Sequence, residues 1–269
     1  MSGWTFRTKQ APPLRVDLRG VTPAALATRS NAEVERWPVG HGKGLVPLGD
    51  FFSVEARDDD ALVFEADLGR FDRVGWQMEG GRLQVDGDVG DYVGGGMRAG
   101  EVVVHGNALA LAACEMAGGL LTIDGNAGDF AASTLPGSMD GMRGGTLVVR
   151  GNAGARMGDR MRRGTALVCG DVGDFLASRM VAGTIAIGGR AGAHVGYGMR
   201  RGSVVFAGAA PGFSTTFVPA VAEAAVFWQL LARDLARHGG PWATLPQRRI
   251  ERQLGDLAAG GKGELIVAC

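Results

Sequence analysis

Side chains that carry out acid–base or nucleophilic chemistry are few in this chain and follow no catalytic pattern. The four histidines lie in unrelated sequence contexts: His41, His105, His194 and His238. No H-x-E, H-E-x-x-H or G-x-S-x-G motif is present, so neither a zinc centre nor a nucleophilic serine is indicated. Two Gly-Lys-Gly triplets, at 42–44 and 261–263, lack the spacing and the following Ser or Thr of a phosphate-binding loop. We therefore expect no catalytic site and no bound cofactor in this chain.

Cysteine usage argues against cross-links and metal clusters. Cys114, Cys169 and Cys269 are odd in number and have no recurring spacing. Disulfide frameworks and zinc or iron–sulfur sites need paired or regularly spaced cysteines. We expect no disulfides and no metal site.

Arginine is the charged residue with regular spacing. Four arginines each follow a methionine directly: Arg98, Arg143, Arg162 and Arg200, with Arg163 and Arg201 beside the last two. If these positions stack, their guanidinium groups form a basic stripe that suits a polyanion such as a polycarboxylate tail. The alternative is a solvated corner in which nearby carboxylates, Asp91, Asp129, Asp159 and Asp174, neutralise the arginines.

The spacing comes from a repeat. Glycines that we call the ruler glycines stand at 81, 100, 119, 145, 164, 183 and 202, in steps of 19, 19, 26, 19, 19 and 19. The odd step returns to 19 if the seven residues TLPGSMD, 134–140, are an insertion. Three residues before each ruler glycine is a methionine: Met78, Met97, Met116, Met142, Met161, Met180 and Met199. A fixed period of this length is typical of stacked structural repeats.

The repeating unit is β, because the second and fourth residues after each ruler glycine are apolar, as in Leu83 and Val85 or Val102 and Val104. A helical unit would not tolerate several glycines at about 1 kcal/mol each. At about 3.3 Å per residue, 19 residues make a ring roughly 60 Å around, enough for about three short strands. We predict an all-β core, a β-solenoid of about seven turns.

If the repeats stack, equivalent positions form columns, and two of these columns predict further structure. The methionines should form an inward ladder of flexible side chains. Asn107, Asn126 and Asn152, with Asp88 and Asp171 in the same column, should occupy turns that favour left-handed geometry and side-chain hydrogen bonds to the backbone.

One outward-facing column is unexpectedly apolar. It reads Gln84, Val103, Thr122, Val148, Leu167, Ala186 and Val205. A helix within 219–240 presents a matching apolar face, made of Val221, Ala224, Ala225, Trp228, Leu231, Ala232 and Leu235, before Gly239 and Gly240 end it. Either this helix or a second protein covers the column, and Leu230, on the helix's other side, favours a partner there.

Whole-chain numbers set further limits. The formal net charge is zero over 269 residues, and 25 of the 28 basic residues are arginine, which we attribute to genome composition and not to nucleic-acid binding. No apolar stretch is typical of a signal peptide or a membrane span, so a cytoplasmic protein without membrane contact is expected.

Three segments are predicted. Residues 1–60 should cap the open end of the solenoid, with helix starts at Thr22–Pro23 and at the capping box of Ser30 and Glu33. Residues 61–213 hold the repeats. Residues 214–269 hold the covering helix and a polar tail that ends in a short strand.

The repeats carry a recognisable signature. GDVGDYVG (87–94), GNAGARMG (151–158) and GRAGAHVG (189–196) fit the GxxGxxxG pattern of the right-handed parallel β-helix shared by the glutamate synthase C-terminal domain and the C subunit of formylmethanofuran dehydrogenase. The flanks WPVGHGKGLVPLGDFFSV (37–54) and GDLAAGGKGEL (255–265) resemble those of the dehydrogenase C subunit. The resemblance spans nearly the whole chain. Ala132, Ala177 and Leu109 depart from the glycine pattern, which affects only local corner geometry.

The resemblance implies a function. A C subunit of this family occurs in the formyltransferase/hydrolase complex of methylotrophic bacteria, and the arginine-rich composition favours that version. It implies a non-catalytic subunit of a four-subunit assembly of one-carbon metabolism. There, a formyltransferase partner moves the formyl group from formyl-tetrahydromethanopterin to methanofuran, and a metal-containing, amidohydrolase-like partner releases formate during formaldehyde oxidation. If the methanofuran carries a polyglutamate tail, the stripe of Arg98, Arg143, Arg162 and Arg200 becomes its track.

Three alternatives stay open. One is the C subunit of a tungsten or molybdenum formylmethanofuran dehydrogenase. Another is a structural module like that of glutamate synthase. The third is an independent enzyme such as a solenoid acyltransferase, which would need a hexapeptide period.

Overall fold

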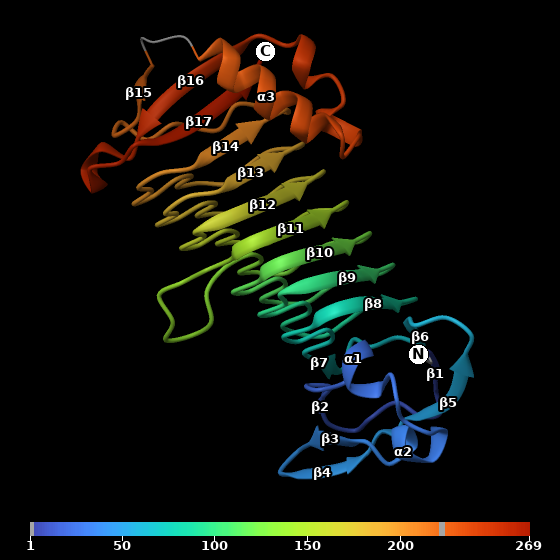
Figure 1. Ribbon diagram of the computed structural model, residues 1–269. Coiled ribbons are helices and arrows are strands. Elements are labelled where there is room, and N and C mark those ends of the chain that lie inside the picture. Colours follow the sequence, from blue (N-terminus) through green and yellow to red (C-terminus); the bar gives the residue numbers. More distant parts are fainter. Residues whose placement is uncertain (1–2, 221–223) are drawn as a thin grey trace.

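The computed structural model describes residues 3–220 and 224–269. In this part the chain is mostly β, with a 13-stranded sheet, a separate 4-stranded sheet and few helices (Figure 1).

The centre of the large sheet is built from one strand per repeat. These strands are β8 (Glu79–Val85), β9 (Ala99–Val104), β10 (Ala117–Ile123), β11 (Arg143–Val149), β12 (Arg163–Val168), β13 (Thr184–Ile187) and β14 (Ser203–Phe206). They lie side by side in sequence order, each parallel to the next (Figure 1). Val102 is opposite Leu83 and Leu121 is opposite Val102, a shift of 19 residues each time. Because Leu147 is opposite Leu121, the register survives the longer step, and 134–140 is an insertion as expected.

The rest of each repeat differs from the expected three strands. A second row of contacts consists of single parallel bridges, linking Leu68, Val89, Ala108, Ala127, Ala153, Val172 and Ala191 in turn. Beyond it, equivalent residues such as Tyr92, Phe130 and Phe175 have φ of 67°, 61° and 61°. Left-handed residues curl the chain into turns and cannot continue an extended ladder. Each repeat therefore has one strand and one bridge, and the expectation of about three strands is wrong.

The methionine column is confirmed as an internal ladder. All seven of its side chains, from Met78 to Met199, are fully buried and belong to one hydrophobic cluster. Their positions superpose, because the N–H groups of Ala117 and Arg143 donate to the carbonyls of Met97 and Met116 over 2.7 and 2.6 Å. Because all seven side chains belong to one cluster, the buried interior is continuous along the stack.

The ruler glycines and the asparagine column have different backbone conformations. The ruler glycines have φ between +80° and +106°, a left-handed conformation that favours glycine, within the first residues of β8 to β12 and directly before β13 and β14. Asn107, Asn126 and Asn152 are not left-handed, so that part of the prediction is wrong. Instead the Oδ1 atoms of Asn107 and Asn126 accept the N–H of the next asparagine in the column, over 2.9 and 2.8 Å. The column is a ladder that ties successive repeats together.

The N-terminal segment extends the large sheet at one end. Its first strand, β1 (Gly3–Thr8), is parallel to β6 (Leu62–Glu65) and antiparallel to β5 (Phe52–Arg57). The small sheet lies beside it, with strands β2 (Val16–Asp17), β3 (Pro38–His41), β4 (Gly44–Pro47) and β7 (Phe71–Asp72). The short helices α1 (Pro23–Leu26) and α2 (Asn31–Glu35) begin at the predicted Thr22 cap and at the predicted capping box.

The C-terminal segment extends the other end of the sheet. Here β17 (Gly263–Ala268) is parallel to β14, followed by β16 (Ile250–Gly255) and β15 (Val218–Pro219). The expected terminal strand is β17.

The helix α3 (Ala225–Ala236) covers part of the apolar outward column. Trp228, Ala232 and Leu235 are buried with the column residues Val148, Leu167, Ala186 and Val205, and Leu231 packs at the edge. The predicted helix thus shares the cover over these four repeats with Trp242 and Leu245, which belong to the same cluster. Ala225 is exposed and Ala224 half-buried, whereas Val221 lies outside the described residues.

Candidate functional site

The potentially reactive side chains are dispersed. His105 Nδ1 lies 2.7 Å from Asp124 on the exposed surface, and the His194 ring stacks on Phe175. Burial raises the pKa of Cys114 to about 12, so that thiol stays protonated. Across 3–220 and 224–269, no group of three or more His, Cys, Asp or Glu side chains is placed to hold a metal ion. None of the helices in the same ranges has the length and apolar character to cross a membrane.

The four stripe arginines have different partners. Arg98 Nη1 lies 2.6 Å from Glu79 Oε1, and Arg143 Nη2 lies 3.9 Å from Glu115 Oε2. Arg162 Nε lies 2.5 Å from Asp140 Oδ1. No ion pair joins Arg200 to a carboxylate within the described part of the chain.

These partners are not the expected ones. Asp91, Asp129 and Asp174 accept backbone N–H groups of the next repeat, from Ala110, Ala155 and Ala193, over 3.0, 2.8 and 2.7 Å. Asp159 binds Arg179. The expectation that these four aspartates neutralise the stripe is therefore wrong. Their side chains are used to connect repeats, or to hold an arginine of another column.

Two adjoining cavities are each lined by at least three basic side chains. One, of about 400 Å³, is lined by Met139, Arg160, Arg162, Arg179, Val181, Gly198, Arg200 and Ala259. The other, of about 320 Å³, is lined by Val181, Arg200, Arg201, Ala259, Gly260 and Lys262. Because they share Val181, Arg200 and Ala259, we treat them as one feature, the basic groove. Arg162 and Arg200 of the stripe lie in it, and Arg98 and Arg143 line neither cavity.

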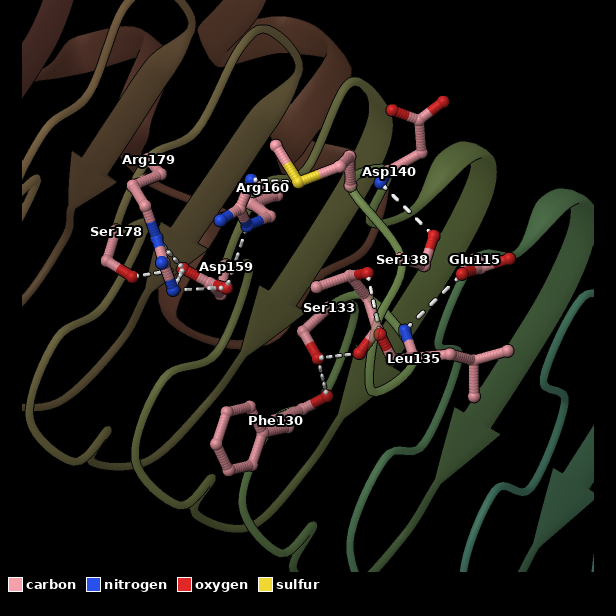
Figure 2. Close-up of polar contacts among 12 residues, drawn as sticks. Glu115, Phe130, Ser133, Leu135, Ser138, Asp140, Asp159, Arg160, Ser178 and Arg179 are labelled. Atoms are coloured by element: carbon pink, nitrogen blue, oxygen red, sulfur yellow. Dashed lines mark hydrogen bonds and ion pairs between the residues drawn. The ribbon is translucent and has the colours of Figure 1, made fainter.

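A buried carboxylate holds one wall of the basic groove. The Asp159 side chain is 3% exposed, and both its oxygens lie 2.8 Å from Nη2 of Arg179. The hydroxyl of Ser178 donates to the same carboxylate, and Arg160 approaches it to 3.9 Å (Figure 2). Arg160 and Arg179 are left-handed, with φ of 57° and 54°. Their backbone strain, about 1 kcal/mol for a non-glycine residue, is offset by contacts that fix where the guanidinium groups lie.

The C-terminal tail supplies the far wall. The N–H of Lys262 donates to the carbonyl of Arg200 over 2.6 Å, continuing the stack beyond the last repeat. Asp256 accepts the N–H of Gly198 and of Ala258, each over 3.0 Å. Burial acts to raise the pKa of Asp256, but hydrogen bonds from Thr216, Gly198 and Ala258 outweigh it and lower that pKa. The tail is thereby anchored to the side of the stack where the arginines lie.

Sequence reasoning missed three of these cations. Arg160 and Arg179 share a column with Gln77, Gly96, Glu115 and Gly198, so no single residue type runs along it to reveal it. Lys262 reaches the groove only because β17 pairs with β14. A helical wheel or a repeat count does not reveal a contact of that kind.

The electrostatics of the groove suit an anion. Six cations, Arg160, Arg162, Arg179, Arg200, Arg201 and Lys262, lie near three carboxylates, Asp140, Asp159 and Asp256. A concave surface lined by charges of one sign concentrates ligands of the opposite sign. Arginine also matches a carboxylate with two parallel N–H donors. The chemistry available here is binding and orientation of a carboxylate-bearing or phosphate-bearing ligand.

Comparison with known proteins places the chain in a family. The family model described as the GXGXG motif matches residues 68–227. A segment of 86 residues is 43% identical to the C subunit of the formyltransferase/hydrolase complex Fhc of Methylorubrum extorquens, over 32% of each chain. A segment of 101 residues is 34% identical to the C subunit of the tungsten-containing formylmethanofuran dehydrogenase 2 of Methanothermobacter wolfeii, covering 36% of this chain and 37% of that protein. The matched segments thus span about a third of the length of these curated relatives.

The structural similarity extends further along the chain. One chain of the crystal structure of the formyltransferase/hydrolase complex (FhcABCD) from Methylorubrum extorquens, in complex with methylofuran, superposes with a TM-score of 0.91 at 41% identity. The superposition covers 98% of this chain and 99% of that one. The chain therefore belongs to the GXGXG-motif family and, within it, to the family of formylmethanofuran dehydrogenase C subunits.

Proposed function

We propose that this chain is the C subunit of a cytoplasmic formyltransferase/hydrolase complex, in which it is a structural platform without a reaction centre of its own. The observation that carries the proposal is the match, over 98% of this chain at 41% identity, to one chain of the solved four-subunit complex. The reaction sequence would run from formyl-tetrahydromethanopterin, through formylmethanofuran, to formate. The formyltransferase, an amidohydrolase-like subunit and one further subunit would be the partners, and the metal would reside in a partner.

The C subunit of a tungsten-containing formylmethanofuran dehydrogenase is the second candidate. It is favoured by 34–35% identity to three Methanothermobacter subunits of that type over about 100 residues. The two assemblies differ in redox chemistry, so metal analysis of the purified complex separates them. Tungsten or molybdenum in stoichiometric amount would support the dehydrogenase, and its absence together with formate release without an electron acceptor would support the hydrolytic complex.

The platform would be a right-handed parallel β-helix over 61–213, closed by residues 1–60 and followed by the covering helix and tail over 214–269. Two observations support a coil. The strands β8 to β14 form a parallel ladder, and a second parallel row of bridges runs from Leu68 to Ala191. Parallel strands of one sheet are joined by right-handed connections in almost all proteins. A coil whose repeats share one buried interior is stiff and presents fixed columns to its neighbours.

The arginine stripe would be the part of this platform that contacts methanofuran, the carrier of the formyl group. Arg98, Arg143, Arg162 and Arg200 would follow an acidic tail along the stack, and the basic groove would hold one end of it, with Arg160 and Arg179 as further contacts. The excess of cations over carboxylates in the groove supports this. The relative's complex contains methylofuran, which supports a carrier close to subunits of this kind.

The experiment substitutes arginines in pairs within the assembled complex. Arg143→Gln with Arg162→Gln should weaken retention of the carrier while all subunits remain assembled. Arg7→Gln, at the opposite end of the sheet and paired with Glu55 and Glu65, is the matched control. Unchanged carrier content in the double variant would contradict the proposal that the stripe binds the carrier. Loss of the assembly itself would show that these arginines contact protein.

A further inference from the structure

The seven-residue insertion lies next to the basic groove and interrupts an otherwise regular stack. It leaves the stack as a long loop between β10 and β11, projecting beyond the neighbouring turns (Figure 1). Since the strand register is the same on both sides, the insertion is not needed to build the sheet.

The loop is held to the body by few contacts. The Arg162–Asp140 ion pair is its strongest link, with side chains 44% and 38% exposed. Arg160 Nη1 lies 3.0 Å from the sulfur of Met139, and the N–H of Leu135 lies 3.4 Å from Glu115 Oε1 (Figure 2). Pro136 and Gly137 are exposed, and no atom lies within 4 Å of where a Cβ of Gly137 would be. Exposed ion pairs contribute about 0.2–1 kcal/mol, so little free energy keeps the loop in place.

Asp140 differs in this respect from the other carboxylates of the groove, because Asp159 and Asp256 are both buried. Asp159 is 3% exposed and bound by both Arg179 and Ser178, so its separation from Arg179 would leave a buried charge without its main partner. Asp140 is attached to a loop, is partly in water and satisfies one arginine. Beside it, no carboxylate of the described residues pairs with Arg200, Arg201 or Lys262. Asp140 is therefore the anion in this groove that an incoming anion displaces at the lowest cost.

We propose that residues 134–140 form a displaceable strap, whose Asp140 carboxylate occupies Arg162 until a carboxylate of an extended polyanionic ligand replaces it. The inference rests on the proposed polyanion groove and adds its regulation. When the ligand enters, the Arg162–Asp140 and Arg160–Met139 contacts break, and the ligand's carboxylates pair with the freed guanidinium groups. The strap lowers the affinity for short or weakly charged anions, and long polyanions overcome it through their additional contacts along the groove.

The test uses the full chain and fluorescein-labelled hexa-L-glutamate, with binding followed by fluorescence anisotropy at low and high salt. Asp140→Asn keeps the shape of the side chain and removes the competing charge. It should tighten binding about threefold at low salt, in keeping with the value of an exposed ion pair. Glu55→Gln removes an exposed arginine-paired carboxylate far along the chain and should leave affinity unchanged. Arg162→Gln and Arg200→Gln should each weaken binding.

Hydrogen exchange of the loop amides supplies the second readout. The strap predicts faster exchange over 135–140 when hexa-L-glutamate is bound. Slower exchange would contradict the strap. An Asp140→Asn variant that binds no tighter than wild type, while Arg162→Gln still weakens binding, would also contradict the strap but not the proposed binding groove. If the wild-type chain does not bind the probe, or if neither arginine substitution matters, the proposed polyanion site itself fails.

Discussion

The terminal methyl of Met97 occupies the space in which a side chain on Gly119 would begin. An ideal Cβ on Gly119 would lie 2.6 Å from Met97 Cε and 2.8 Å from the carbonyl oxygen of Gly100. The relationship recurs between Met116 and Gly145, at 2.8 Å. Six of the seven methionines pack in this way against the ruler glycine of the following repeat, and Met199 packs against Gly263 instead, so the two columns depend on each other.

Substitution of a ruler glycine is expected to be strongly destabilising. Gly119→Ala should lower the free energy of unfolding by about 2–4 kcal/mol, since it combines a backbone clash with a left-handed φ of +84°. Gly20→Ala is the matched control, because its φ is +88° but no atom lies within 4 Å of the added Cβ. Urea unfolding of both variants separates the two effects. Equal losses at the two positions would show that packing against methionine contributes nothing.

The asparagine ladder is expected to contribute through its acceptor atoms. Asn126→Ala removes the Oδ1 that accepts the N–H of Asn152, and should cost about 1 kcal/mol, the usual net value of one hydrogen bond. Asn126→Asp keeps this acceptor, and aspartate already occupies the column at 88 and 171. The aspartate variant should therefore melt closer to wild type than the alanine variant. The opposite order in thermal unfolding would exclude the ladder as the reason for asparagine here.

The anchoring of the tail should depend on pH through Asp256. Its folded-state pKa is lowered, so the carboxylate stabilises the fold above the ordinary value of 3.8, and this contribution is lost as the pH falls from there through the folded-state pKa. Asp256→Asn should be less stable at pH 7 and should lose less further stability between pH 5 and pH 3. Urea unfolding across this range measures the difference. Identical slopes for the two proteins would contradict the assignment.

The two sides of α3 are expected to respond differently to truncation. Trp228 is 4% exposed, and its indole N–H donates to the carbonyl of Arg248 over 3.2 Å, so Trp228→Ala should destabilise the chain by about 3–5 kcal/mol. Leu230 is 65% exposed, and Leu230→Ala should change the stability of the isolated chain by less than about 0.5 kcal/mol.

Leu230 of α3 can also be used to test whether a partner protein packs against this helix. If a partner protein packs on this side, Leu230→Ala should weaken its retention during size-exclusion chromatography of the complex. A Leu230→Ala complex as durable as wild type, with the isolated chain also unaffected, would place the interface elsewhere.

Positions that repeat a residue type were predictable from the sequence. The methionine ladder, the strands after each ruler glycine and the insertion follow from counting, because a stacked fold places equal positions above one another. The covering helix was predictable because its apolar face, which includes Trp228, matches the apolar outward column, which includes Val205. These features depend on residue types that recur at fixed spacing, and such recurrence can be read from a single sequence.

Positions defined by conformation or by distant pairing were not predictable. Tyr92, Leu111 and Arg156 share a left-handed φ although one side chain is aromatic, one aliphatic and one charged. Asp159 was expected to neutralise the stripe, but the left-handed Arg179 is presented to it instead. Lys262 enters the groove through a pairing between segments about 60 residues apart. No residue type or spacing encodes these contacts, since the backbone geometry creates them.

The central claim is that this chain is the non-catalytic platform of a four-subunit assembly. Native mass spectrometry of the complex, purified through a tag on this chain, tests it most directly. The account predicts one stable assembly that contains this chain together with three different subunits, and that releases formate only as a whole. A chain recovered alone or as copies of itself, or one that releases formate without partners, would contradict the account.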